Sequence, residues 1–280
     1  MKAIFRMGFA EYRRWISNPR MLMVLVLMVY AREAVGKALC QHAIDMGENL
    51  QIWEPFLALS NSYVAMLVVP IFFLVLMADF PIMDGSYLWS VYRMGKVKWI
   101  LGQIVFLVYS SVTIIVAMIL SGIISCWGVF SLKNEWSNVI TRYYIFAPEN
   151  ADTMTAQLIT GDVYNHISPV EALLLAVSLS VLAMVLYGII LMCGKIYGRK
   201  YLSLAICIGT IGVGSVLRLL NLKVGFLLPI SHMTLGGHYM EYRRKMIMSF
   251  GASYGYFGVL IALLILLTVI GIKGRNLCKN

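Results

Sequence analysis

Two long runs without a charged residue constrain this chain more than any other feature of its sequence. They extend over 63–78 and 99–127, and apolar side chains make up most of both. A membrane-spanning helix needs roughly 20 predominantly apolar residues, so the runs predict transmembrane helices, the first extended back to Leu57. Residues 79–98 join the runs, and we therefore expect them to form a loop at one face of a membrane.

Composition places the whole chain in the same class. Of its 280 residues, 60% are hydrophobic and 13% are charged, and no polar stretch is long enough to bury a core of its own. A soluble domain does not need so much apolar surface. We predict an all-α, multi-pass membrane protein that forms a single transmembrane domain over 1–280, with Pro70 kinking the second span. Its six spans are expected at 21–40, 57–78, 99–127, 169–193, 201–220 and 254–272.

The net charge of +10 indicates membrane contact rather than nucleic-acid binding, because charges gather at the ends of apolar runs, where they meet headgroups and set topology. Four segments hold 14 of the 23 Lys and Arg residues: 1–20, 79–98, 194–200 and 273–280. The positive-inside rule places them in the cytoplasm, and 128–168 is then an outer loop. Since 218–253 holds five more, 221–253 is either an outer segment that re-enters the membrane or a sign of a different topology.

The loop over 79–98 has an organisation of its own. Asp79 and Pro81 end the preceding helix, because proline disfavours helical geometry in the residue before it. Asp84-Gly85-Ser86 then supplies turn and N-cap residues. From Ser86 onward, apolar residues recur at helical spacing, and together with the N-cap they predict a short amphipathic helix over 84–94. Its apolar face is formed by Tyr87, Leu88, Val91 and Tyr92, and Arg93 lies beside them.

Residues 1–18 predict a second amphipathic helix. Aromatic and aliphatic side chains fall on one face and cations on the other, a pattern typical of helices that lie in the membrane interface. A merely basic cytoplasmic tail accounts poorly for the aromatic stripe. The two faces are Ile4, Phe5, Phe9, Tyr12, Trp15 and Ile16 against Lys2, Arg6 and Arg13.

Three charged residues, Arg32, Glu33 and Lys37, fall in the expected first span. Glu33 and Lys37 have the spacing and order of a helical ion pair. A charge at the bilayer centre costs on the order of 3 kcal/mol, so these residues either extend to the outer interface or line the outer end of a transport pathway.

The fifth span is rich in small residues. Ala205 and Gly209 form a small-xxx-small pair, and Gly212 continues their face. Such residues let two helix backbones approach closely. We expect close packing through this face, within the subunit or across a dimer.

Catalytic and cofactor motifs are not evident. The sequence has no G-x-x-x-x-G-K-[ST] phosphate loop, and its one G-x-S-x-G match, Gly251 to Gly255, falls at the start of the expected sixth span and not between a strand and a helix. His232, His238 and Glu241 match no standard metal spacing, and we expect them to be interfacial polar residues. We therefore expect neither an enzyme nor a bound metal or cofactor in this chain.

One family resembles this layout. The run Arg93-x-x-Lys96-x-x-Trp99, which leads into Gly102-Gln103 after a short loop helix, is similar to the region before the third span in permeases of type-2 ATP-binding-cassette (ABC) exporters. The resemblance implies that 1–18 is an elbow helix and 79–98 a coupling loop. Its helix would bind a separate ATPase subunit through the apolar residues named above and Arg93. ATP and Mg²⁺ would then belong to that partner.

The resemblance thus implies the permease subunit of an ATP-driven exporter in a bacterial cytoplasmic membrane. It would move an amphiphilic substrate outward, such as a peptide, a lipid or a drug-like molecule, and an antimicrobial-peptide export or immunity system is one instance. A second copy or a paralogous permease would complete the dimer. The alternatives are a non-transporting membrane scaffold or sensor and, less favoured, an intramembrane enzyme. A neighbouring gene for an ABC ATPase would discriminate between them.

Overall fold

A computed structural model describes residues 1–83, 85–150, 158–220, 222–240 and 245–274, and for 85–88, 150, 240 and 245 it describes the backbone alone. Helices dominate the described chain. The α-helices are α1 (Lys2–Ile16), α2 (Leu22–Ala31), α3 (Lys37–Met46), α4 (Glu54–Asn61), α5 (Tyr63–Leu76), α6 (Gly85–Met94), α7 (Lys96–Ser125), α8 (Asn138–Phe146), α9 (Gly161–Tyr164), α10 (Pro169–Ile196), α11 (Lys200–Leu219) and α12 (Phe250–Gly274).

Short elements connect these helices. They comprise the 3-10 turns η1 (Pro19–Met21), η3 (Pro148–Asn150), η4 (Lys223–Leu227), η5 (Pro229–His232) and η6 (Gly236–His238), and a π-helical turn, η2 (Arg32–Gly36). Strands β1 (Leu50–Gln51) and β2 (Phe130–Ser131) pair in parallel, whereas β3 (Tyr239–Met240) and β4 (Lys245–Met246) pair antiparallel.

Four helices of the described chain, α7, α10, α11 and α12, are long and apolar enough to cross a membrane. They coincide with the predicted third to sixth spans. The all-α class is therefore confirmed, together with the helices that a membrane protein requires.

The first and second predicted spans are divided. Along the first, α2, η2 and α3 follow one another without a gap between Leu22 and Met46. In the second, α4 and α5 meet at 88°. The bend falls at Ser62, whose ψ of 128° takes the backbone out of the helix. Pro70 lies inside α5, away from this bend, and a kink of α5 at Pro70 stays a prediction.

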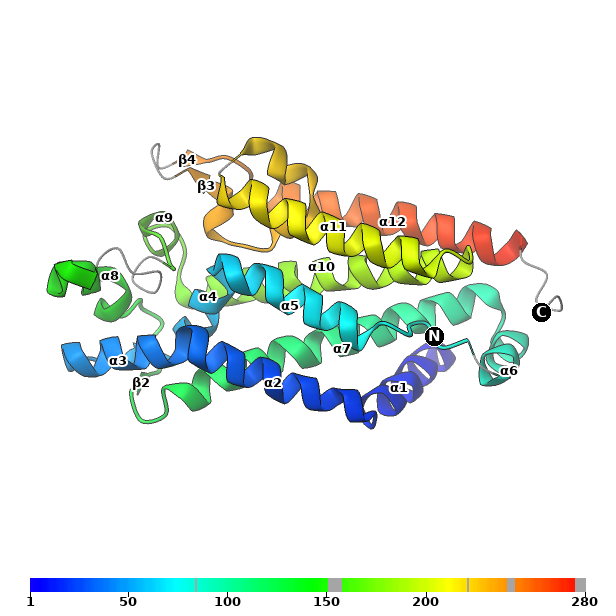
Figure 1. The fold of residues 1–280 in the computed structure, drawn as a ribbon, viewed down its shortest axis with the longest axis horizontal. Coiled ribbons are helices and arrows are strands. Elements are labelled where there is room, and N and C mark those ends of the chain that lie inside the picture. The colour runs from blue at the N-terminus through cyan, green and yellow to red at the C-terminus, as the bar shows by residue number, and fades with distance from the viewer. Residues whose placement is uncertain (84, 151–157, 221, 241–244, 275–280) are drawn as a thin grey trace.

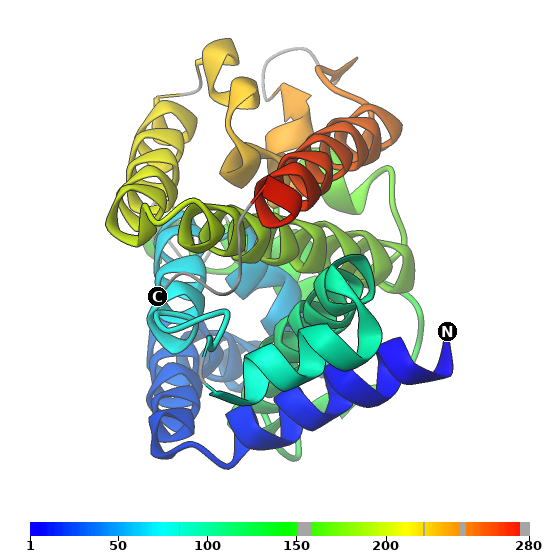
Figure 2. The same cartoon turned by 90° about the vertical axis from the view of Figure 1, so that its right-hand side faces the viewer.

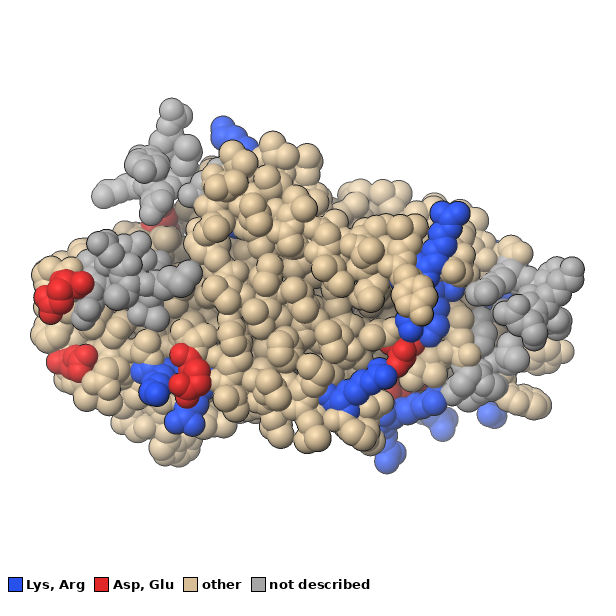
Figure 3. Space-filling view, in the orientation of Figure 1, with Lys and Arg blue, Asp and Glu red and all other residues tan. Residues whose placement is uncertain are grey.

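The predicted inner and outer segments lie at opposite ends of the molecule. Figure 1 shows the long helices running along its longest axis, with α1 and α6 at one end and α8, α9, β3 and β4 at the other. Charged side chains gather toward the two ends of the face in Figure 3, and a broad uncharged band separates them. This arrangement matches a membrane layer between two polar faces, and the sidedness remains a prediction.

Helices α7 and α10 approach each other closely in the core. A Cβ atom built on Gly188 of α10 would lie 2.3 Å from a methyl group of Leu107 of α7, so only a glycine permits this approach. The largest fully buried side chains of the core are Trp99, Tyr187 and Phe73. The long helices are thereby held as one body, which positions the inner end described next.

Helix α1 forms where the amphipathic pattern predicts it, and it packs against α7. Figure 2 looks at the inner end and shows α1 extended across it. Met7 packs against Gly102 of α7, where a Cβ atom would lie only 2.6 Å from Met7 Sδ. The hydroxyl groups of Tyr12 and Thr113 share a hydrogen bond of 2.8 Å. Phe5 and Phe9 remain about half exposed. The placement of α1 in a membrane interface stays a prediction.

Candidate functional site

The candidate site is the inner end of the molecule, centred on α6. The predicted helix over 84–94 forms as Gly85–Met94, with Asp84 outside the described residues. Gly95 follows with a φ of 87°, a conformation that favours glycine, and its amide donates to the Val91 carbonyl oxygen. Helix α7 starts at the next residue, so a single glycine separates α6 from a long apolar helix.

Of the four residues predicted to form the apolar face of α6, two have described side chains, and these two differ in exposure. Val91 is buried, with 4% of its surface exposed, whereas Tyr92 is 93% exposed. Trp89, which the sequence analysis did not select, is 79% exposed. The side chains of Tyr87 and Leu88 lie outside the described residues.

Among the described side chains of α6, those of Trp89, Tyr92 and Arg93 are exposed. They share one helix face, because Tyr92 and Arg93 lie three and four residues after Trp89. Large exposed aromatic side chains with an adjacent cation are typical of contact surfaces for a protein partner. Val91 instead anchors the helix to its own chain.

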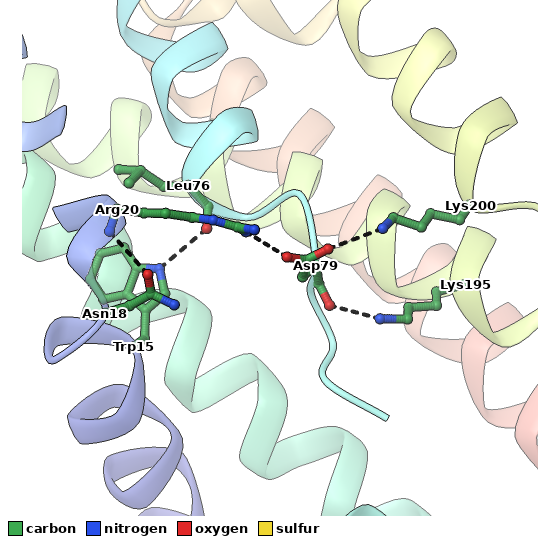
Figure 4. Close-up of polar contacts among 7 residues, drawn as sticks. All are labelled: Trp15, Asn18, Arg20, Leu76, Asp79, Lys195 and Lys200. Carbon is green, nitrogen blue, oxygen red and sulfur yellow. Dashed lines mark hydrogen bonds and ion pairs between the residues drawn. The ribbon is translucent and has the colours of Figure 1, made fainter. Parts of the chain in front are cut away.

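Asp79 ties the loop before α6 to three other parts of the inner end (Figure 4). Its carboxylate accepts hydrogen bonds from Arg20 Nη1 at 2.5 Å and from Lys200 Nζ at 3.2 Å. Lys195 Nζ donates to the Asp79 backbone oxygen at 2.7 Å. Arg20 follows α1, Lys200 is the first residue of α11, and Lys195 lies in the last turn of α10. One aspartate therefore joins the ends of three helices.

Hydrogen bonds from Arg20 and then from Lys200 lower the pKa of Asp79, which keeps the carboxylate charged. About half of the Asp79 and Arg20 side chains remains exposed, so each ion pair contributes little to stability. The cluster is better suited to fixing the position of the loop than to stabilising the fold.

Two further contacts complete this end. Trp15 Nε1 donates to the Leu76 backbone oxygen at 3.4 Å, which joins α1 to the end of α5. Lys96 Nζ donates to the Lys273 backbone oxygen at 3.4 Å, which joins the start of α7 to the end of α12. All of these basic residues belong to segments that the charge count predicts on the inner side.

The charged residues of the predicted first span lie on the protein surface. Two of them belong to η2, and the third directly follows it. Arg32, Glu33 and Lys37 are exposed, and Glu33 and Lys37 form the expected ion pair at 3.5 Å. Their exposed side chains are open to a second chain, water or lipid, and a role in lining a pathway stays a prediction.

The predicted packing face of α11, formed by Ala205, Gly209 and Gly212, is open in the described part of the chain. A Cβ atom built on Gly209 or Gly212 meets nothing within 4 Å, and Ala205 is exposed. Close packing of this face within the subunit is therefore wrong, and packing across a dimer stays a prediction. The close contact of α11 occurs instead at Gly214, which lies against Ile230.

At the outer end, His232 and His238 meet at one serine. His232 Nδ1 and His238 Nε2 each lie 2.8 Å from Ser253 Oγ, and the other ring nitrogens donate to the backbone oxygens of Phe226 and Thr234. Burial lowers the pKa of His238 to about 4. Glu241 lies outside the described residues, among which no group of three or more His, Cys, Asp or Glu side chains could hold a metal ion.

A buried carboxyl group organises the outer loops. Glu54 is completely buried and accepts hydrogen bonds from Ser137 N and Ser137 Oγ, both at 2.7 Å, and from Gln51 N at 2.9 Å. It thus joins α4 to the start of α8. No local pattern predicts this role, because Ser137 lies 83 positions after Glu54 in the chain.

No family of known proteins, no curated protein and no solved structure matches this chain.

Proposed function

We propose that this chain is the membrane subunit of an ATP-driven exporter of the type-2 ABC kind, coupled to a separate ATPase through α6. The observation that carries the proposal is the exposure of Trp89 and Tyr92 on a short helix at the inner end. That helix is joined to α7 by one residue, so a force applied to it reaches a long apolar helix directly.

The contacts of the inner end suggest how the force would spread. Movement of α6 would pull on α7 through Gly95 and on the preceding loop through Asp79. Because Asp79 also contacts Lys195 and Lys200, the ends of α10 and α11 would move with it. The expected substrate class remains an amphiphilic peptide, lipid or drug-like molecule, and ATP and Mg²⁺ would bind to the partner.

The exposed faces of the long helices support a second permease subunit. Charged side chains at Arg32, Glu33 and Lys37 are costly if they face lipid, and the glycine face of α11 is open. A dimer that covers these faces would place the charges beside a polar pathway and bring small residues into helix contact.

The test is co-expression with an ABC ATPase encoded beside this gene, followed by co-purification and measurement of ATP hydrolysis in lipid. We expect a stable complex whose hydrolysis rate depends on the permease. An ATPase that purifies alone and hydrolyses ATP at the same rate with and without this chain contradicts the proposal. Binding without substrate movement in vesicles would favour a scaffold or sensor.

A further inference from the structure

Two cysteines from distant parts of the chain meet at the outer end. Cys40 lies in α3, and Cys126 directly follows α7. In Figure 1, α3 and β2 lie at the end of the molecule that also carries α8 and α9. The charge count predicts this end on the outer side of the membrane, where disulfide bonds can form and persist. Both thiols are free in the structure, which therefore represents their reduced form.

One backbone oxygen brings the two residues together. Cys126 Sγ donates to the Gly36 carbonyl oxygen at 3.5 Å. Because Gly36 is the N-cap residue of α3, the same oxygen accepts the first intrahelical hydrogen bond of α3, from the amide of Cys40. Residues four apart share a helix face, and side chains tilt toward the N-terminus of a helix. Cys40 thus lies on the side of α3 where Cys126 binds, and the two thiols interact through charge and hydrogen bonding.

Close packing fixes the backbone on both sides of this pair. A Cβ atom built on Gly36 would lie 2.7 Å from the Cβ atom of Ser125, so α3 starts in direct contact with the end of α7. A few residues further along both segments, β1 pairs with β2, and Leu50 N donates to the Val129 oxygen at 2.9 Å. The segments that carry the two cysteines are therefore already joined in the reduced protein.

The two thiols differ in exposure, which gives the oxidation an order. Cys126 is fully buried, whereas Cys40 is partly exposed. A disulfide-bonded oxidant on the outer side can reach Cys40 and form a mixed disulfide, from which Cys126 then displaces the oxidant. The two protein thiols lose two electrons and two protons in total, and the oxidant takes them up as its disulfide is reduced to two thiols.

We propose that Cys40 and Cys126 form a disulfide bond at the outer end of the protein. The bond joins α3 to the end of α7 and closes a long loop of the chain that contains α4, α5 and α6. A crosslink of this kind stabilises the folded state mainly by restricting the unfolded chain. The proposal requires the predicted outer position of this end and does not depend on the proposed export function.

The first test traps the thiols as they exist in cells. The full-length chain is produced in a bacterium that has a thiol-oxidising pathway outside its cytoplasmic membrane, denatured in SDS with N-ethylmaleimide, and digested for mass spectrometry. We expect a peptide pair linked through Cys40 and Cys126 that disappears on reduction. Cys193 and Cys207, which lie in α10 and α11, should be alkylated without reduction. Alkylation of both Cys40 and Cys126 without prior reduction would overturn the proposal.

Thermal unfolding gives an independent measurement. Reduction of the purified chain in detergent should lower the midpoint of unfolding by roughly 5 °C. Cys40→Ser should start from the lower midpoint and should not respond to reduction. The matched control is Cys193→Ser, which replaces another partly exposed cysteine and should respond to reduction like the parent protein.

A response of Cys40→Ser to reduction that equals the response of the parent protein would refute the bond, because the reductant would then act elsewhere. If Cys40→Ser does not fold, the linked peptide of the parent protein still decides, since it is detected without any substitution.

Discussion

Replacing the exposed aromatic residues of α6 should abolish docking of an ATPase and leave this chain intact. An aromatic side chain buries about 150–250 Å² when fully covered. Trp89 and Tyr92 are 79% and 93% exposed, so most of that area is still available to a partner. At about 25 cal/mol per Å², covering either side chain would contribute roughly 4 kcal/mol, and this figure is an upper bound because association has its own costs.

Alanine retains part of the contact, and we therefore expect Trp89→Ala and Tyr92→Ala each to cost about 2–4 kcal/mol of binding. This corresponds to an affinity about 30-fold to 700-fold weaker. The unfolding midpoint of the isolated chain should hardly change, since neither side chain is buried in it. The double variant should also lose stimulated ATP hydrolysis in lipid.

Trp127 provides a matched control. It is also 79% exposed but follows the opposite end of α7, so Trp127→Ala should bind the ATPase like the parent protein. Binding of the double variant within twofold of the parent would refute a docking role for α6. Equal losses for Trp127→Ala would show that the aromatic residues act through general stability.

The remaining predictions concern the inner cluster, the outer histidines, dimerisation and topology. Asp79→Asn should change stability by less than about 1 kcal/mol, because its ion pairs are half exposed, yet lower ATPase stimulation; unaltered stimulation would exclude the cluster from coupling. The pKa of His238 is lowered to about 4 in the folded chain from an ordinary value of 6.5, so its contribution to stability is present above pH 6.5 and is lost as the pH falls towards 4, by up to about 3 kcal/mol. Unfolding measured across this range should show the loss, and His238→Gln should flatten the curve. Gly209→Leu should leave the isolated subunit stable but prevent its dimerisation in crosslinking experiments, and normal dimers would exclude this face. In a cysteine-free background, an impermeant reagent applied to intact cells should label Leu132→Cys and not Ser90→Cys, and the reverse pattern would invert the topology.

Local patterns in the sequence identified most of the helices. The interval 84–94 and the helix Gly85–Met94 nearly coincide, because turn residues and a glycine define both ends. The same holds for α1, and the third to sixth predicted spans overlap α7, α10, α11 and α12. Length, apolar composition and flanking charge are local properties, and a single sequence reports them well.

The features that sequence could not supply depend on distant partners. Arg20 and Lys200 lie 59 and 121 positions from Asp79, so no spacing rule brings them together. Val91 is buried because α6 packs against its own chain. The helical periodicity of the sequence instead assigns Val91 and Tyr92 to the same apolar face. The bend at Ser62 has no proline or glycine to mark it, and the proline that does occur in this span lies inside α5.

The π-helical turn η2 sets the phase of the helix that follows it. Such a turn accommodates one residue more than an α-helical turn, and each residue advances an α-helix by about 100°. A chain one residue shorter within Arg32–Gly36 could form regular α-helix throughout, but α3 would be rotated by roughly that angle. Leu39 would leave the core, and His42 would lose its ring stacking on Tyr143, which has a centroid distance of 3.7 Å. Single-residue deletions in this turn should therefore be less tolerated than substitutions at its exposed positions.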